Sequence, residues 1–163
     1  MIIVAIDPGT ANTGVAVYDS EAQKVIECVT IKTKSTGQDQ MALNDRCWKI
    51  CIETSLAISE IMFDDFQWEI EDTVTVIEGF ASFGGNRQNA NTFQTPFLVG
   101  YLCATLNPDV IQTSNKVFSK YGRSLRDSIK DGTCSVEGCQ KATNDHERSA
   151  LCHALYYANG GKW

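Results

Sequence analysis

Two carboxylates in this chain each follow an apolar run and come directly before a turn. Asp7 ends the run 2–6, which is rich in β-branched residues, and Glu78 ends the run 73–77. Runs of this kind are typical of strands buried on both faces of a sheet. An unpaired buried charge is costly, so each acid needs a donor, a cation or a metal. If the two strands are neighbours, the acids lie side by side and favour a hard cation such as Mg²⁺.

A second group of polar side chains falls on the helix that the spacing predicts over 145–158. Asp145 and His146 lie in its first turn, where the helix dipole stabilises negative charge. At about 100° per residue they share one side with Ser149 and His153, while apolar residues form the other side. With Asp7 and Glu78, the pair Asp145 and His146 gives a plausible set of four metal ligands. Taken singly, an N-cap aspartate and a solvated or core histidine explain these two residues equally well.

The elements that must position these residues alternate between strands and helices. The pattern predicts strands over 2–6, 15–17, 25–31, 73–78 and 109–113, and helices over 41–66, 91–105, 115–130 and 145–158. The basic helix 115–130 is expected to break at Gly122. This order predicts an α/β fold with a mixed five-stranded sheet that helices cover on both faces. Functional groups of such sheets gather where the strands end.

The bulk composition limits the class of protein. The chain of 163 residues suits one compact domain over 1–163, and 43% hydrophobic content makes widespread disorder unlikely. No apolar stretch is long enough to span a membrane, and no basic segment precedes the first apolar run as in a signal peptide. The seven scattered cysteines are expected to be free thiols in a reducing cytoplasm.

The net charge of −6 hides an uneven distribution along the chain. Residues 39–78 carry ten acidic side chains against two basic ones, whereas residues 79–130 carry six basic against two acidic. The second segment is therefore able to hold a phosphate backbone that the first would repel. A mixed, solvated surface is the simpler interpretation for any single charge.

Four motifs resemble the RuvC family of Holliday junction resolvases, in the right order and over nearly the whole chain. They are Asp7-Pro8-Gly9-Thr10 with Thr13-Gly14, the strand-ending Glu78, Asn115-Lys116-Val117 with Gly122, and Asp145-His146 with Ala150-Leu151. The small size fits a bacteriophage-type member, which would act in the host cytoplasm. The resemblance implies a ribonuclease-H-like fold, a homodimer, and nicking of four-way DNA junctions that depends on Mg²⁺ or Mn²⁺, with two ions per site.

The resemblance also implies roles for single residues. Asp7 and Glu78 match the first two catalytic acids of the family, and His146 matches a third position that is Asp or His. Asp7 would bridge the two metals, Glu78 would hold one, and His146 with Asp145 would hold the other or orient the attacking water. Lys116 is similar to a family lysine near the scissile phosphate.

One departure from the family pattern concerns Ser149, where the family usually has an Asp. A neutral hydroxyl is a weak Mg²⁺ ligand. Asp145, four residues earlier on the same expected face, is the candidate to compensate. Without compensation, the chain would bind junctions and cut them poorly.

The loop after Glu78 and the basic helix are the expected DNA-binding segments. Phe80 and Phe83 are both candidates to wedge into the junction or to stack on its bases. Phe83 is the better of the two, because a position in the core explains Phe80 slightly better than base stacking does. The expected contacts to phosphates or base edges come from Asn86, Arg87, Asn89, Lys116, Lys120, Arg123 and Arg126. Two helices, 41–66 with Trp48 and 91–105, are candidates for the dimer interface.

Several alternatives remain open at this point. The four polar residues alone do not separate a junction resolvase from another ribonuclease-H-like nuclease that acts on branched DNA or RNA. Ser149 leaves room for a junction-binding protein with a weakened site. An Asp-x-Gly-Thr opening also occurs in sugar kinases and actin-like ATPases, but the chain lacks their length and repeat. Zinc held by Cys134 and Cys139 with a later His or Cys is disfavoured because their spacing is not that of a zinc knuckle.

Overall fold

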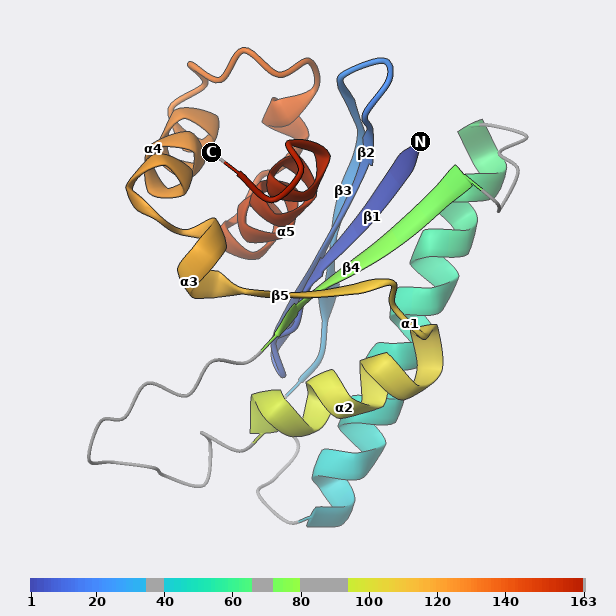
Figure 1. The fold of residues 1–163 in the computed structure, drawn as a ribbon. Coiled ribbons are helices and arrows are strands. Elements are labelled where there is room, and N and C mark those ends of the chain that lie inside the picture. Colours follow the sequence, from blue (N-terminus) through green and yellow to red (C-terminus); the bar gives the residue numbers. More distant parts are fainter. Residues whose placement is uncertain (35–39, 66–71, 80–93, 163) are drawn as a thin grey trace.

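The computed structural model describes residues 1–34, 40–65, 72–79 and 94–162 (Figure 1). Its strands are β1 (Ile2–Asp7), β2 (Asn12–Asp19), β3 (Lys24–Lys32), β4 (Thr73–Gly79) and β5 (Val110–Thr113). Its helices are α1 (Gln40–Asp65), α2 (Gln94–Leu106), α3 (Ser114–Val117), α4 (Lys120–Lys130) and α5 (Asp145–Ala158), with a 3-10 turn at Cys139–Lys141. No helix in these ranges is long and apolar enough to cross a membrane.

The five strands form one mixed sheet in the order β3-β2-β1-β4-β5. β1, β2 and β3 pair antiparallel, whereas β4 and β5 run parallel to β1. The α/β class and the mixed five-stranded sheet predicted from the sequence are therefore confirmed. β1 lies at the centre, which explains why its residues 2–6 are all fully buried.

Helices cover both faces of the sheet (Figure 1). α1 and α2 pack on one face, against the β1 side chains Ile2, Val4 and Ile6. α5, with α4 behind it, packs on the other face against Ile3 and Ala5. Side chains alternate between the two faces of a strand. Asp7 follows Ile3 and Ala5 in this alternation, so it points to the α5 side.

The basic segment differs from the predicted helix over 115–130. It forms two helices, α3 and α4, that separate at Phe118 and Ser119, whereas Gly122 lies within α4 and does not break it. Phe118 ends α3 and packs against the core beneath α5. Its inward turn explains why the chain changes direction here.

α5 begins and ends at the predicted residues. Its predicted polar side, however, is not exposed to solvent along the whole helix. Ser149, Cys152 and His153 are buried along with the apolar residues of the helix. The predicted polar side is buried because α4 packs on α5, and α5 itself packs on three central strands. A helix that is covered all round buries its polar residues too, and each of those needs a partner.

Candidate active site

The strand register brings Asp7 and Glu78 together. Ile6 of β1 pairs with Ile77 of β4 in parallel, so the next residue of each strand is one of the two acids. Val76 belongs to the core on the α5 side, and Glu78 shares that orientation. The two carboxyl groups lie close enough for each to shift the pKa of the other, and their side chains are only 14% and 17% exposed. The adjacency predicted from the sequence is therefore present in the fold.

The charge on this pair is unfavourable without a counterion. The pKa of Asp7 is raised to about 6: burial is the largest cause, the contact with His146 opposes it, and the neighbouring Glu78 adds to it. Burial alone would also raise the pKa of Glu78, but contacts with His153, Asp7 and Ser149 outweigh it and lower that pKa. Between the ordinary carboxyl pKa and about pH 6, the Asp7 carboxyl group therefore retains a proton that an isolated carboxyl group would have lost. Such a pair attracts a cation.

His146 approaches the acids from the first turn of α5. Its Nδ1 lies 3.0 Å from Asp7 Oδ2, and this contact raises the pKa of the imidazole. Two glycines allow the approach. A Cβ on Gly14 would lie 2.3 Å from the His146 carbonyl oxygen, and a Cβ on Gly9 would lie 3.1 Å from His146 Cε1, besides meeting the Asn12 oxygen at 2.2 Å. The glycines of the opening motif thus serve the histidine as well as the turn.

A capping network fixes the start of α5 on β3. Asn144 is the N-cap, and its side-chain oxygen accepts from the backbone N–H groups of His146 and Glu147, both at 3.1 Å. Glu147 in turn accepts from the backbone N–H of Thr143, the residue before the cap, at 2.7 Å, and from Thr30 Oγ1 at 2.6 Å. The sequence reasoning missed this acid, although the spacing of Asn144 and Glu147 is a recognisable capping signal.

Three further side chains surround the Glu78 carboxylate. The hydroxyl of Ser114 donates to Oε1, that of Ser149 donates to Oε2 at 3.2 Å, and His153 Nε2 lies 3.3 Å from Oε2. Ser149 therefore faces the site, as the family resemblance implied, and holds a carboxylate by a hydrogen bond. No simple spacing in the sequence indicates Ser114 or His153 as neighbours of Glu78.

Asp145 is not brought to this cluster. Its side chain is 78% exposed and pairs with Arg148 at 3.1 Å. The reason is that Asn144 takes the capping position, which leaves the following residue on the outside of the first turn. The expected compensation of Ser149 by Asp145 has no support in this arrangement.

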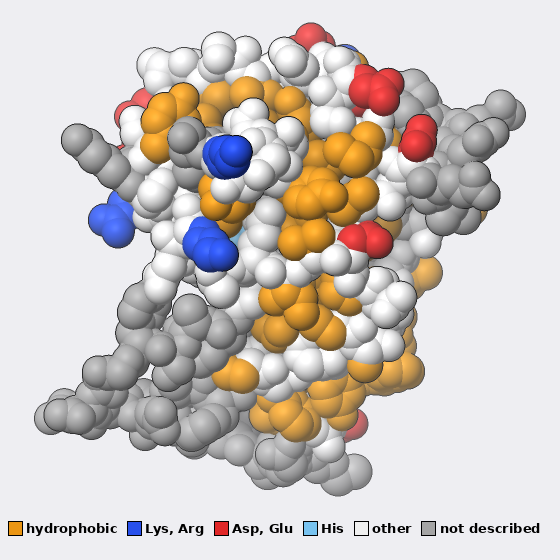
Figure 2. All heavy atoms as spheres, viewed as in Figure 1, with side chains coloured by type: hydrophobic (Ala, Val, Ile, Leu, Met, Phe, Trp, Pro, Cys, Tyr) orange, Lys and Arg blue, Asp and Glu red, His pale blue; other side chains and the backbone are white. Residues whose placement is uncertain are grey.

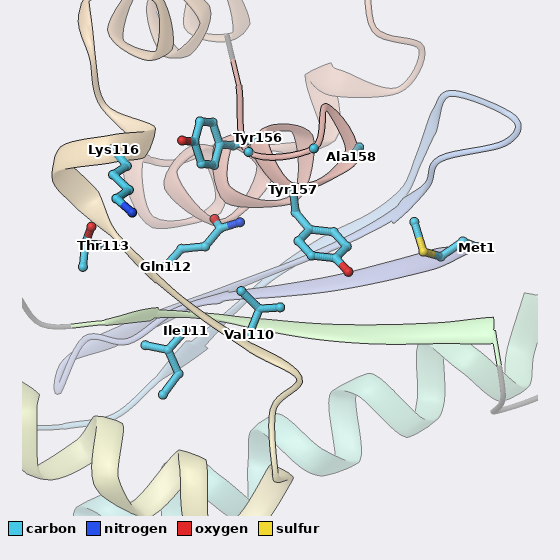
Figure 3. A pocket seen from close by; sticks show the side chains of 11 residues that line it. Met1, Val110, Ile111, Gln112, Thr113, Lys116, Tyr156, Tyr157 and Ala158 are labelled. Carbon is cyan, nitrogen blue, oxygen red and sulfur yellow. The ribbon is translucent and has the colours of Figure 1, made fainter.

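Lys116 lies on α3, in the helix whose first residue, Ser114, contacts Glu78. Its exposed side chain lines a cavity of about 600 Å³ between β5 and the end of α5, together with Gln112, Thr113 and Tyr156 (Figure 3). It is placed at the margin of the acidic cluster, within the same end of the sheet.

The predicted DNA-binding residues divide into two sets. Phe80, Phe83, Asn86, Arg87 and Asn89 lie outside the described residues, as does the side chain of Lys120. Two arginines of α4 hold the turn at its start. Arg123 Nε donates to the Phe118 carbonyl oxygen at 3.1 Å, and Arg126 stacks over the Phe118 ring at 5.6 Å.

The two carboxylates at the strand ends suit a hard divalent cation such as Mg²⁺, and the imidazole of His146 beside them is a ligand that Mn²⁺ also accepts. In the arrangement described here His146 faces Asp7 directly, and within the described ranges no three His, Cys, Asp or Glu side chains converge on one point. Cys134 and Cys139 likewise belong to no group of three such side chains within the described ranges. The Cys139 thiol lies 3.6 Å from the Cys134 carbonyl oxygen. The donor set thus fits a cation by its chemistry and charge.

Comparison with solved structures identifies the fold. The chain is similar to Thermus thermophilus RuvC in complex with a Holliday junction substrate, with a TM-score of 0.67 and 17% identity over 99% of this chain and 97% of that one. A second T. thermophilus RuvC structure gives 0.62 and 14% over 99% and 98%. Fowlpox virus resolvase in complex with Holliday junction DNA gives 0.53 and 15%, covering 98% of each chain.

No family model matches the sequence, and no curated protein matches it significantly. The ribonuclease-H-like fold of RuvC is therefore established by structure, at a sequence identity too low to carry function by itself.

Proposed function

We propose that this chain is a metal-dependent endonuclease that resolves four-way DNA junctions by paired, symmetric nicks. The observation that carries the proposal is the contact of Asp7 with both Glu78 and His146 at the ends of two parallel strands. Support comes from the fold, because two solved structures of similar architecture hold Holliday junction DNA. One domain over 1–163 would carry the activity, in the cytoplasm.

Asp7, Glu78 and His146 are the proposed metal-holding residues. Divalent cations, Mg²⁺ or Mn²⁺ and two per site, would supply an activated water and stabilise the leaving oxygen. Ser114 and Ser149 keep the Glu78 carboxylate oriented by donating to its two oxygens. His146 holds Asp7 from the opposite side, and Lys116 would contact a phosphate near the scissile bond. Asp145 as a further ligand stays a prediction.

The proposed DNA surface lies on the side of α3 and α4. In Figure 2 most of the visible Lys and Arg side chains gather on this side, and most acidic ones lie across the molecule. Arg123 is exposed, and Arg126 is partly exposed beside Phe118. These cations would follow one arm of the junction, while residues 80–93 would reach its centre. This charge separation explains how a chain of net charge −6 can bind DNA.

The proposal requires two active sites, because a four-way junction has two-fold symmetry. The outer side of α1 exposes a stripe of large apolar side chains at helical spacing. They are Trp48, Ile52, Leu56 and Phe63, exposed by 43% to 84%. An apolar groove of about 630 Å³ adjoins the stripe at Trp48 and is otherwise lined by residues of α2. We propose that this surface, the α1 stripe, forms a homodimer.

A second candidate function follows from Ser149. Its neutral hydroxyl donates to Glu78 where a carboxylate would add a negative charge, so the site holds one negative charge fewer for a cation. A junction-binding protein with weak or no cutting is therefore the alternative, and Ser149 is the residue that favours it.

A nicking assay separates these functions. The substrate is a labelled four-way junction beside a linear duplex of the same sequence, incubated with Mg²⁺, Mn²⁺ or EDTA. A resolvase nicks the junction in symmetric pairs and loses this activity in EDTA. Tight binding without nicks would favour the junction-binding protein, and equal cutting of the duplex would favour another nuclease of this fold.

A further inference from the structure

His153 is a polar residue in an otherwise apolar stretch of α5. It lies seven residues after His146, two helical turns further along, and its side chain is fully buried. Its neighbours Cys152 and Ala154 are also fully buried, and its ring contacts the edge of Phe118 at 5.7 Å. Packing alone would be satisfied by an aliphatic side chain, so the imidazole needs another explanation.

The two ring nitrogens of His153 face two specific partners. Nε2 makes no hydrogen bond to the described residues, and Glu78 Oε2 lies 3.3 Å from it, at ion-pair distance. Nδ1 lies 2.9 Å from the Gln112 side-chain oxygen. A buried ring nitrogen is costly to leave unpaired, and the Glu78 carboxylate is the acceptor that an Nε2–H reaches.

The strand register explains why these partners meet. Glu78 of β4 pairs with Gln112 of β5, so the two side chains are neighbours on the α5 side of the sheet. Figure 3 shows Gln112 reaching from β5 toward α5 beneath Tyr156. An amide offers both a donor and an acceptor, and its two ends are interchangeable in shape. With the –NH₂ end of Gln112 turned to Nδ1, that ring nitrogen accepts and the imidazole proton resides on Nε2. The three side chains form a connected unit, Gln112–His153–Glu78.

We propose that His153, itself oriented by Gln112, is a positioning residue that holds the Glu78 carboxylate ready for a divalent cation. This inference rests on the proposed function, because it concerns a residue behind the same site. Nε2 lies at ion-pair distance from Oε2, and Ser149 donates a hydrogen bond to the same oxygen. The carboxylate is thereby fixed in one rotamer. In a site where position 149 adds no negative charge, affinity depends more strongly on such orientation.

The test measures Mn²⁺ binding to the DNA-free protein by electron paramagnetic resonance, beside junction nicking as a function of Mn²⁺ concentration. Substitutions of residues that orient metal ligands typically weaken metal affinity by about 10- to 100-fold. We expect His153→Leu to weaken Mn²⁺ binding by about that factor and to leave junction binding unchanged. Gln112→Leu should act in the same direction by a smaller factor. His153→Gln retains an N–H near the position of Nε2 and should restore most of the affinity.

Leu151→Ala is the matched control for loss of packing. Leu151 is fully buried on the same helix and belongs to its apolar core, so this variant should lower the melting temperature and keep the Mn²⁺ affinity. Wild-type affinity in both His153→Leu and Gln112→Leu would overturn the inference and leave the proposed function standing. If His153→Leu does not fold, Gln112→Leu decides alone. A wild-type chain that binds no Mn²⁺ and cuts no junction would overturn both proposals.

Discussion

His146 Nδ1 lies 3.0 Å from Asp7 Oδ2, which joins the first turn of the last helix to the end of the first strand. The two residues are separated by almost the whole chain, and the Gly9 and Gly14 positions leave the space that the contact needs. A proton held between these groups competes with any cation for the same lone pairs. The contact therefore links protonation, metal binding and the docking of α5 on the sheet.

The first prediction concerns pH. The pKa of Asp7 is raised to about 6, and the pKa of His146 is also raised. At pH values above the ordinary carboxyl range, these two groups therefore bind more protons in the folded chain than in the unfolded chain. The lowered pKa values of Glu78 and Glu147 have the opposite effect, but only in and below the ordinary carboxyl range. Metal-free stability should therefore fall as pH rises from about 5 through 6 and on through the histidine titration. A bound cation removes this cost, so Mn²⁺ should raise the melting temperature more at pH about 7.5 than at about 5.5. Scanning calorimetry at both pH values measures the difference, and an equal rise would contradict it.

The second prediction concerns Gly14. In Gly14→Ala the new methyl group would clash with the His146 carbonyl and with the Glu147 amide, displacing the start of α5. We expect a loss of stability of about 1–3 kcal/mol and a larger proportional loss of nicking. Gly100→Ala is the stability control, because its added methyl group meets nothing within 4 Å and α2 gains a better helix former. Equal stability of the two variants would contradict the role of Gly14.

The third prediction concerns Ser149. Ser149→Asp brings a third carboxylate into a buried site. It would lie beside the Glu78 oxygen that accepts a hydrogen bond from Ser149 in the wild-type chain. Without metal, repulsion should lower the melting temperature in EDTA. With Mn²⁺, the extra ligand should tighten binding by about tenfold or more, about 1.4 kcal/mol. Melting curves in EDTA and in Mn²⁺ check both signs, with Ser149→Ala as the variant that removes the hydroxyl without adding charge. A rise in stability in EDTA would contradict the account.

The fourth prediction concerns the α1 stripe. Leu56→Glu places a charge in the proposed dimer interface, on a side chain that is 56% exposed in the monomer. We expect sedimentation to show a monomer, and paired nicks to become single nicks. Tyr121→Glu is the matched control, since Tyr121 is 62% exposed on α4, away from the stripe, and this variant should remain a dimer. A dimeric Leu56→Glu would exclude this interface.

The sequence was sufficient for the sheet and for the acidic pair. Buried strands that end in acids predicted the adjacency of Asp7 and Glu78, because parallel neighbours align their carboxyl ends. The predicted bounds of the last helix, 145–158, agree with those of α5, because its apolar spacing is regular. These features depend on local pattern and on strand pairing.

The remaining parts of the site depend on contacts between elements distant in sequence. Asp145 was expected inside, but the Asn144 cap sets the phase of the helix and turns Asp145 outward. His153 was placed on a polar side, but it is buried against Glu78 of β4, Gln112 of β5 and the Phe118 ring. The break at Phe118 follows from packing against the core, which the Gly122 signal does not report. Helical periodicity cannot predict such coverage.

Cutting of a supercoiled plasmid that extrudes a cruciform should distinguish wild-type protein from Asp7→Asn. Asn keeps the size of the side chain and removes the charge that the proposed metal site needs. We expect wild-type protein to linearise the plasmid in Mg²⁺ or Mn²⁺ and Asp7→Asn to leave it intact, although both bind a synthetic junction equally well. Linear plasmid produced by Asp7→Asn at the wild-type rate would contradict the assignment of the active site.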